Sequence, residues 1–236
     1  MTIINSGGIN MSYAGRLVMA LTIIFSLGLW VETHPQEGEL VYIVAYLEVD
    51  PTSVEEVAEL LKRYRSSTRD ASGNLRSEIL QRINRPGHFS FVEEWQDEVS
   101  FNTHSSSEYT QALHLALVPH LTSSYDERRH FGLAVTRNAA AGEIFVVTHV
   151  DIVPSRKDEG LTFVEAMVRS SHADPGNIGF YALVQSNRGN HVTLVEEWQD
   201  EESWQAHVVS PHMRITRRNL LPTSGALYDE RLFKRL

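Results

Sequence analysis

The stretch that decides the fold occurs twice in the chain. Residues 88–96 read HFSFVEEWQ and residues 191–199 read HVTLVEEWQ, so the second copy lies 103 residues after the first. The same offset, with no gap, carries the sequence YDER from residues 125–128 to residues 228–231. Self-similarity at a fixed offset indicates a duplicated structural unit, and we therefore expect two copies of one module.

The repeat divides the chain into three parts. Two modules span residues 40–134 and 143–236, and a stretch of small residues at 137–142 lies between them. Residues 1–39 precede both copies and have no counterpart in the repeat. Domains typically contain about 100–150 residues, so a module of this length is close to the size of an independent unit.

Each module has the pattern of a β-α-β-β-α-β unit. In the first module the apolar run at residues 40–49 predicts a strand covered on both faces, and apolar residues at helical spacing predict a helix from Val54. We expect Thr52 and Ser53 to cap this helix through a capping box with the glutamates that follow. The remaining elements are expected as a hairpin at residues 75–84 and 88–96, a short helix after Asp97, a longer helix with Tyr109 on its inward stripe, and a strand at residues 124–133.

This order of elements is ferredoxin-like and belongs to the α+β class. One such module leaves one face of its sheet without helices, yet the predicted strands are apolar on both faces. An apolar sheet face must be buried, and the obvious cover is the sheet of the other module. We therefore predict two tandem ferredoxin-like modules packed as a dimeric α/β barrel within one chain, which makes the protein a monomer (a pseudo-dimer) or a homodimer.

The N-terminal segment resembles an export signal. Residues 17–31, LVMALTIIFSLGLWV, carry no charge and follow Arg16. This length fits the apolar region of a signal peptide, about 7–15 residues, better than a membrane-spanning helix, which needs about 20. No small-residue cleavage pattern follows, so an uncleaved anchor and a buried core helix stay open as alternatives. We expect an exported protein, periplasmic or secreted, or one associated with the membrane through residues 17–31.

The composition excludes several kinds of partner and site. The 236 residues carry a formal net charge of -9, and no Lys/Arg cluster is long enough to supply the basic face that phosphate contacts need. We therefore expect no nucleic-acid partner. The chain contains no cysteine, which excludes disulfides, thiolate metal sites and a cysteine nucleophile.

Two segments resemble the antibiotic biosynthesis monooxygenase (ABM) family. They are residues 196–212 (EEWQDEESWQAHVVSPH) and, more weakly, residues 93–104 (EEWQDEVSFNTH). The typical family pattern is an acidic residue two before a Trp, a short helix, and a His nine residues after the Trp. The lead-in Asp174-Pro175-Gly176 before a strand also fits. The resemblance implies a dimeric α/β barrel. It implies less about function, because such modules include cofactor-independent oxygenases of quinols or polycyclic phenols, haem-degrading enzymes and members of unknown activity.

The chain departs from both of these chemistries at defined positions. The quinone-forming oxygenases of the family place an Asn four residues before the Trp, where this chain has Phe91 and Leu194. The haem-degrading members place a second aromatic at the position of His104 and an axial His ten residues beyond it, where this chain has His114 and Arg217. His114 lies off the apolar stripe of its helix, so we expect it to face solvent. Haem binding in that mode is therefore not expected.

A Trp and a Glu form the first candidate pair in each module. Trp95 shares a strand face with Glu93, and Trp198 shares one with Glu196, because residues two apart in a strand point to the same side. The pair can be structural, with a core Trp and a Glu that fixes it. Alternatively, both side chains line a substrate pocket.

A His and an aromatic residue form the second candidate pair. His104 and His207 lie three residues after Phe101 and Trp204, so each pair occupies one face of a helix. The His can be a structural clasp hydrogen-bonded to the strand Glu. It can also line a pocket in which an imidazole with a near-neutral pKa takes a phenolic proton.

The second module is richer in titratable groups than the first. His149 replaces Tyr46 on the first strand of the module, and His212 replaces Tyr109 on a helix. Such divergence is expected if only one copy kept a site. Several histidines and a carboxylate could bind a metal, but no spacing in the chain has metal-site specificity, so we expect no metal.

These observations predict a cofactor-independent monooxygenase acting on a small aromatic or quinol-type substrate, with the substrate itself reducing dioxygen. The alternative is a non-catalytic binding module for an apolar or aromatic ligand. The expected catalytic residues are His207, Trp204, His212 and His149, and the expected substrate-binding residues are Trp198, Glu196, Trp95, His104 and Phe101. Neither a cofactor nor a metal is expected.

Overall fold

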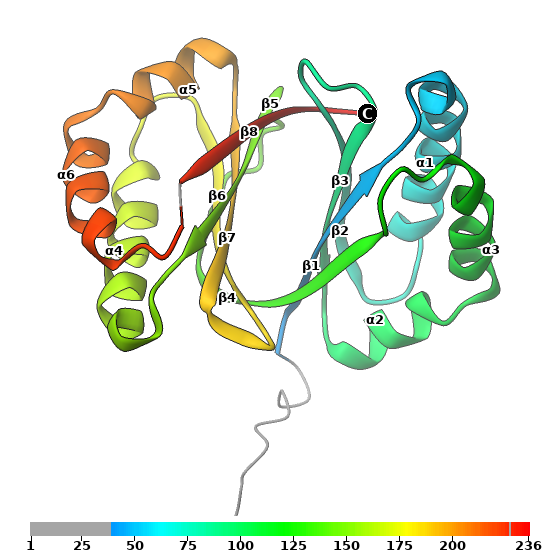
Figure 1. Ribbon diagram of the computed structural model, residues 1–236, viewed down its shortest axis with the longest axis horizontal. Helices are drawn as coiled ribbons and strands as arrows, with labels where there is room; N and C mark the ends of the chain where they lie inside the picture. Colours follow the sequence, from blue (N-terminus) through cyan, green and yellow to red (C-terminus); the bar gives the residue numbers. More distant parts are fainter. Residues whose placement is uncertain (1–38, 227) are drawn as a thin grey trace, which may run out of the picture. The chain divides into compact units, whose positions relative to one another are not determined.

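The structure is a computed structural model that describes residues 39–226 and 228–236 (Figure 1). The apolar segment at residues 17–31 lies outside the described residues, so its role as a signal or anchor stays a prediction. Within the described ranges no helix combines the length and apolar character needed to cross a membrane.

Both modules follow the predicted order of elements. The second helical region of each consists of a short helix and a longer one, as predicted for the first module. The first module contains β1 (Val41–Glu48), α1 (Val54–Arg69), β2 (Asn74–Arg82), β3 (His88–Trp95), α2 (Glu98–Ser105), α3 (Glu108–Leu117) and β4 (Asp126–Arg137). The second contains β5 (Ile144–Asp151), α4 (Lys157–Ser171), β6 (Asn177–Gln185), β7 (Arg188–Trp198), α5 (Glu201–Val208), α6 (Pro211–Leu220) and β8 (Asp229–Arg235). The last strand of the first module therefore extends beyond the expected end at residue 133.

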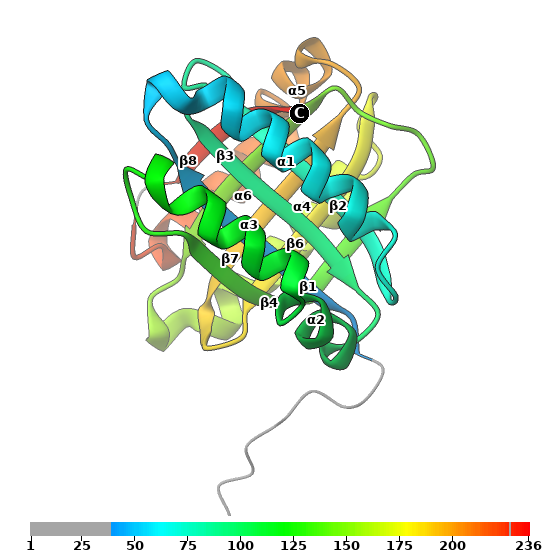
Figure 2. The ribbon, with the colours of Figure 1, turned by 90° about the vertical axis from the view of Figure 1, so that its right-hand side faces the viewer.

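The eight strands form one closed antiparallel barrel in the order β1-β3-β2-β8-β5-β7-β6-β4. Each module keeps its own four strands adjacent, and the modules meet where β4 pairs with β6 and where β2 pairs with β8. The helices cover the outside of the barrel, α1 to α3 over the first module and α4 to α6 over the second (Figures 1 and 2). The predicted intrachain barrel is confirmed.

The two seams between the modules differ in length. Residues 130–137 of β4 pair with residues 179–185 of β6. The other seam pairs residues 80–82 of β2 with residues 233–235 of β8, and one more backbone hydrogen bond of 2.9 Å follows at each end, from the Ile83 N–H to the Leu232 carbonyl and from the Leu236 N–H to the Ile79 carbonyl. The first seam is therefore held by a long ladder of backbone hydrogen bonds and the second by a short one.

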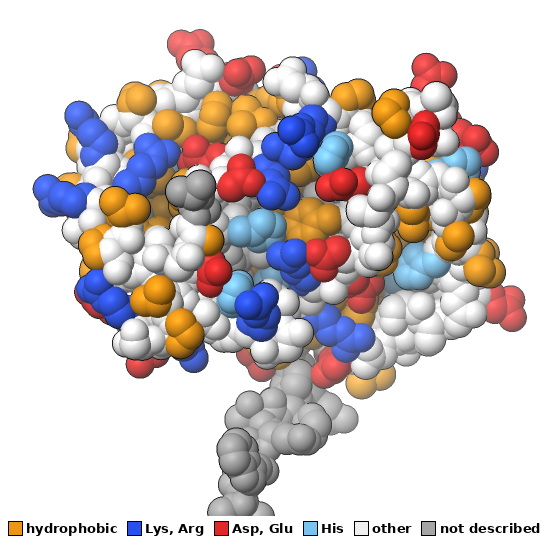
Figure 3. Space-filling model, in the orientation of Figure 1, with side chains coloured by type: hydrophobic (Ala, Val, Ile, Leu, Met, Phe, Trp, Pro, Cys, Tyr) orange, Lys and Arg blue, Asp and Glu red, His pale blue; other side chains and the backbone are white. Residues whose placement is uncertain are grey.

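Ion pairs extend the short seam. The Arg235 guanidinium lies 2.8 Å from the Glu78 carboxylate and 3.0 Å from the Glu197 carboxylate, and Arg76 also pairs with Glu197. Both carboxylates are buried, so these arginines neutralise charges that would otherwise be costly at a barrel wall. Figure 3 shows acidic, basic and His side chains intermixed around the centre of the face that it draws.

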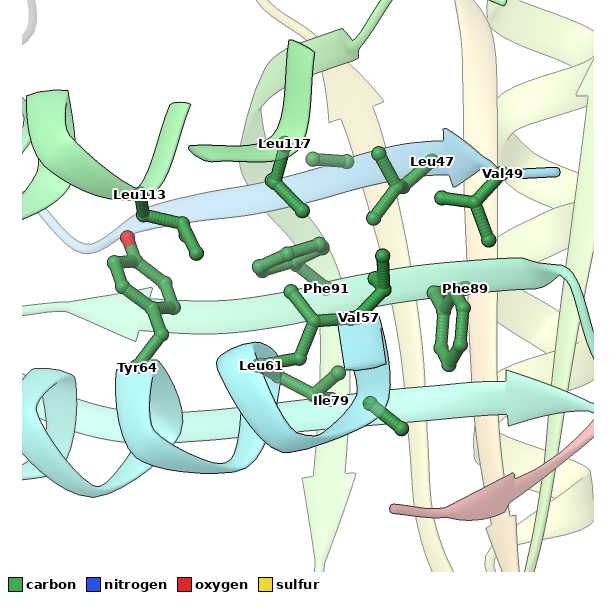
Figure 4. Packing of buried hydrophobic residues seen from close by; sticks show 12 residues of the cluster. Leu47, Val49, Val57, Leu61, Tyr64, Ile79, Phe89, Phe91, Leu113 and Leu117 are labelled. Carbon is green, nitrogen blue, oxygen red and sulfur yellow. The ribbon is translucent and has the colours of Figure 1, made fainter. Parts of the chain in front are cut away.

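Alternate residues of each strand face two different cores. The barrel interior is filled from both modules, by side chains that include Val44, Leu80, Phe145, Val147 and Leu183. On the outer side of the first sheet, Leu61 and Tyr64 of α1 and Leu113 of α3 point toward Phe91 of β3 (Figure 4). Burial of both faces explains why the strands carry nearly continuous apolar runs.

The start of α1 differs from the prediction. Asp50 is the capping residue, since its carboxylate accepts a hydrogen bond from the Thr52 N–H at 2.8 Å. The Ser53 side chain makes no capping hydrogen bond. The predicted capping box was wrong because a short 3-10 turn, Pro51–Ser53, precedes the helix and moves the first free N–H groups toward the N-terminus. The predicted cap at Asp97 is confirmed, with its carboxylate accepting from the Ser100 N–H at 2.7 Å.

Two residues of α3 also lie differently from the prediction. Tyr109, expected on the inward stripe, is 43% exposed and stacks on Tyr64 with 6.0 Å between ring centroids. His114, expected to face solvent, is half-buried, with its ring centroid 4.9 Å from that of Tyr125, and burial lowers its pKa. The buried stripe is shifted by one position because Thr110 faces the sheet.

Candidate functional site

A Trp and Glu pair lies under the helices of each module. Trp198 Nε1 donates a hydrogen bond to Glu196 Oε2 at 2.9 Å, and Trp95 Nε1 donates to Glu93 Oε2 at the same distance. All four side chains are buried. Burial disfavours the charged carboxylate, so it raises the pKa of Glu196 to about 8 and that of Glu93 to about 7. The predicted pairing on one strand face is confirmed in both modules.

In the second module His207 of α5 covers this pair. Its ring centroid lies 4.6 Å from that of Trp198, and its Nε2 atom lies 3.8 Å from Glu196 Oε2. Its Nδ1 atom lies 2.7 Å from Asp174 Oδ2. Burial lowers the pKa of His207, while the hydrogen bond with Asp174 acts in the opposite direction. The strand Glu and the buried His are thus neighbours, but the closest polar partner of the His is Asp174.

Trp204 and His212, two further predicted residues, lie beside this group of side chains, which we call the His207 cluster. Trp204 of α5 packs against Trp198 and its neighbours, and its Nε1 atom is buried without a hydrogen-bond partner in the described part of the chain. His212 of α6 places Nε2 at 3.1 Å from Asp174 Oδ2. The ring centroids of His207 and His212 are 5.5 Å apart.

Asp174 is a site residue that the sequence analysis did not identify. Asp174 was noted there only as part of the motif Asp174-Pro175-Gly176, which precedes a strand. Its equivalent in the first module is Ala71, and this change from an alanine to an acidic residue in an otherwise similar turn is the signal that could have drawn attention to it.

The first module has a different arrangement around its histidine. His104 Nε2 lies 3.0 Å from the Tyr64 hydroxyl, and its ring centroid lies 4.8 Å from that of Trp95. Phe101 is buried against Trp95. The clasp was predicted between His104 and the strand Glu, but among the described residues His104 contacts the hydroxyl of Tyr64 in α1 instead.

His149 does not belong to the cluster, contrary to the prediction. It lies on the inner side of the barrel, where its ring centroid is 5.3 Å from that of Tyr46. Burial lowers the pKa of His149 to about 4. Its cross-strand partner is Thr193, whereas Glu196 lies on the opposite, helix-covered side of the same sheet. The sheet therefore separates His149 from His207.

Two surface pockets flank the cluster. One, of about 460 Å³, lies beside α5 and is lined by Asp174, Pro175, Asp200, Glu202, Ser203, Ala206, His207, Ser210 and Pro211. The other, of about 490 Å³, lies between α6 and β8 and is lined by Arg217, Arg218, Leu220, Leu221, Ser224, Ala226, Tyr228 and Glu230. Arg217 connects the two regions, since it donates to the Val208 carbonyl at 2.7 Å and to Glu230 Oε1 at 3.1 Å.

The fold and these buried groups define a class of protein, a tandem α/β barrel in which each module carries a Trp, Glu and His group under its helices. The sequence model of the antibiotic biosynthesis monooxygenase family matches the chain twice, at residues 40–116 and 143–219. The chain therefore belongs to this family, as the resemblance indicated, and it is monooxygenase-like. No curated protein matches the chain.

Solved structures share the tandem architecture. A "putative monooxygenase" from Fusobacterium nucleatum subsp. nucleatum is 14% identical, with a TM-score of 0.77, covering 85% of this chain and 94% of that one. A second "putative monooxygenase", from Lactobacillus acidophilus, is 12% identical, with a TM-score of 0.71 and coverage of 84% and 94%. An anthrone oxidase-like protein is 12% identical, with a TM-score of 0.64 and coverage of 85% and 92%. At these identities the likeness shows the fold alone.

Proposed function

We propose that the second module takes a small aromatic, quinol-type substrate and that the protein acts on it as a cofactor-independent monooxygenase. The observation that carries the proposal is the buried carboxyl group of Glu196, whose pKa is raised to about 8. Groups that line the pocket between α6 and β8 act on this carboxyl, since the Glu230 charge raises its pKa and the Arg217 charge lowers it. A carboxyl group poised near neutral pH can exchange a proton with a phenol.

The pocket between α6 and β8 suits an aromatic compound. Leu220 and Leu221 give it apolar walls, and Tyr228 adds an aromatic one. Its Arg217 and Glu230 side chains are paired with each other, so they can orient a polar ring substituent without presenting an isolated charge to an apolar ligand. A volume of about 490 Å³ falls within the range of about 300–1,000 Å³ that is usual for small-molecule sites.

The proposed reaction uses the substrate as the reductant. Loss of a proton from a phenolic or similar substrate in the pocket, where Glu230 lines the wall near the buried Glu196 carboxyl, gives an electron-rich anion, and this anion reduces dioxygen. With anthrone, a tricyclic compound, the ring CH2 group becomes a carbonyl. One oxygen atom enters the product, the other leaves as water with the two hydrogens of the CH2 group, and the four electrons that dioxygen gains come from that carbon.

A hydrogen bond from Trp198 holds the carboxyl group of Glu196, and His207 packs beside the pair. Trp198 donates this hydrogen bond through Nε1, and His207 lies over the Trp198 ring with Nε2 3.8 Å from the carboxyl oxygen. The family membership supports an oxygenase, and the anthrone oxidase-like neighbour makes anthrone a reasonable first probe.

The test is oxygen consumption by the full-length protein with anthrone, with the protein-free rate subtracted. We expect one anthraquinone formed per dioxygen consumed, and we expect Glu196→Gln to lower the rate by about 10²–10⁴-fold. The matched variant Glu93→Gln should lower it far less. Saturable anthrone binding without oxygen consumption would favour the alternative, a non-catalytic binding module. Neither binding nor oxygen consumption with anthrone or with simple hydroquinones would contradict the proposal.

A further inference from the structure

We infer that Asp174, His207 and His212 form a binding site for one divalent first-row transition metal ion of the Zn²⁺ type. Each residue offers one ligand atom, and the three atoms lie within 4.8 Å of one another. The site goes beyond the proposed function, since it lies beside α5 and uses none of the residues that line the pocket between α6 and β8. Nothing in the oxidation of an aromatic substrate requires it.

The ligand atoms have the right chemistry and nearly the right spacing. Two imidazole nitrogens and one carboxylate oxygen suit Zn²⁺ and its neighbours in the first transition row. Asp174 Oδ2 lies 2.7 Å from His207 Nδ1 and 3.1 Å from His212 Nε2. Ligand atoms bound at about 2.0–2.2 Å around a tetrahedral ion are roughly 3.3–3.6 Å apart, so each of the two Asp174 contacts would have to lengthen by less than about 1 Å to admit the ion.

The second nitrogen of each imidazole faces an oxygen atom. His207 Nε2 lies 3.8 Å from Glu196 Oε2 and has no hydrogen-bond partner among the described residues. His212 Nδ1 lies 3.1 Å from Ser210 Oγ. Metal-binding histidines almost always donate the N–H of their other nitrogen to a carboxylate, a carbonyl or water, which fixes the ring orientation. A metal on His207 Nδ1 would leave the proton on Nε2, where it points toward the buried Glu196 carboxyl.

The backbone holds the three ligands from three separate segments. Asp174 lies in the turn after α4, where its N–H donates to the Ser171 carbonyl at 3.0 Å and its carbonyl accepts from the Asn177 N–H at 3.1 Å. Gly176 closes this turn with a positive φ of 78°, and a Cβ at this position would clash with the Ser203 side chain. The carboxylate is therefore presented to α5 and α6 by a rigid turn.

The cluster is shielded on one side and open on the other. The His207 side chain is 1% exposed, whereas that of Asp174 is 18% exposed and lines the pocket of about 460 Å³ beside α5. Asp200 and Glu202 line the same pocket, and their carboxylates favour the approach of a cation. Three protein ligands with an open side leave a coordination position for water or another small ligand.

The first module shows what the same fold does without such a site. Its equivalent turn is closed by Gly73 with a φ of 79°, but Ala71 replaces Asp174 and Tyr109 replaces His212. The hydroxyls of Tyr64 and Thr110, which lie 3.0 and 3.4 Å from His104 Nε2, are both replaced by methionine in the second module. The third hydroxyl near His104 Nε2, that of Thr68 at 3.4 Å, is kept as Ser171, whose Oγ lies 3.5 Å from His212 Nε2. His207 therefore lacks two of the hydroxyls that surround His104, and it has gained two potential co-ligands.

The test is Zn²⁺ binding by the full chain without an affinity tag, measured by calorimetry, with Co²⁺ absorption as a spectroscopic readout. We expect one tight equivalent in the wild type. Asp174→Ala and His212→Tyr place the residues of the first module in the second, so folding should be preserved, and each should weaken Zn²⁺ binding about 100-fold or more. The control His191→Ala, which removes a different histidine of the second module, should leave the affinity unchanged.

Two results would overturn the inference. One is a wild-type protein with no stoichiometric Zn²⁺ or Co²⁺ binding. The other is a double variant, Asp174→Ala with His212→Tyr, that binds as tightly as the wild type, which would assign the binding to other histidines. The anthrone assay is run separately on chelator-treated protein, so the metal site and the proposed function can each fail alone.

Discussion

Asp174 Oδ2 lies 2.7 Å from Nδ1 of His207, and the first module has no counterpart of this contact because Ala71 occupies the equivalent position. His104, the partner of His207 in the repeat, contacts the hydroxyl of Tyr64 in α1. The duplicated imidazole is thus tied to the helix α1 in one copy and to the turn after α4 in the other. We therefore expect the two copies to have separable roles.

His207→Ala should reduce oxygen consumption with anthrone, or anthrone affinity if the protein only binds it, much more than His104→Ala does. His207 lies beside the Glu196 carboxyl on which the proposed reaction depends, whereas loss of the structural contact made by His104 mainly lowers stability. Activity and melting temperature should be measured for both variants. Equal activity losses that follow the losses in melting temperature would show that both histidines are structural.

Glu196→Gln should change how stability depends on pH. The pKa of Glu196 is about 8 in the folded protein and 4.5 for an ordinary glutamate. Between these values the folded state binds more protons than the unfolded state, so the wild type loses stability as the pH rises. The variant lacks this loss, and its free energy of unfolding should therefore gain on that of the wild type between about pH 5 and pH 8. Urea unfolding at several pH values measures it, and parallel curves would contradict a raised pKa.

The isolated second module, residues 143–236, should self-associate. In the full chain the first module covers the barrel-facing side of its sheet, where Phe145, Val147 and Val195 are buried. Removal of the first module exposes this apolar face, and a second copy of the fragment is its natural cover. Sedimentation should find a dimer of the fragment. A stable, folded monomer would show that the barrel interface is not needed to bury the sheet.

The segment at residues 17–31 should direct export. Protein purified from its native host should either begin after about residue 31 or remain full-length in the membrane fraction. Mass spectrometry of the N-terminus, combined with cell fractionation, distinguishes these two outcomes. Full-length chain in the soluble cytoplasm would remove the basis for an exported or membrane-associated protein.

The repeat was enough to predict the architecture, because two copies of one element order with strands apolar on both faces leave few ways to bury the sheets. Because both faces of the strands are buried, the sequence did not show on which face His149 lies. When both strand faces are apolar, alternation does not reveal which residues face the barrel interior, so His149 was placed with His207 although the sheet lies between them. Asp174 was missed for another reason. Its contacts with His207 and His212 join segments far apart in the sequence, and only the packing of α5 and α6 against the turn brings them together.

The two seams between the modules are unequal, so one side of the barrel is held by fewer backbone hydrogen bonds than the other. The seam in which residues 130–137 pair with 179–185 is the longer one, and the linker from β4 to β5 passes the end of β7, where the Glu143 N–H donates to the Trp198 carbonyl at 3.0 Å. The opposite edge is held by the short pairing of residues 80–82 with 233–235 and by Arg235, one residue from the C-terminus. The covalent linker between β4 and β5 keeps the two modules in one chain even if the short seam between β2 and β8 separates. The fusion therefore removes the dependence on protein concentration that a barrel assembled from two separate modules would have.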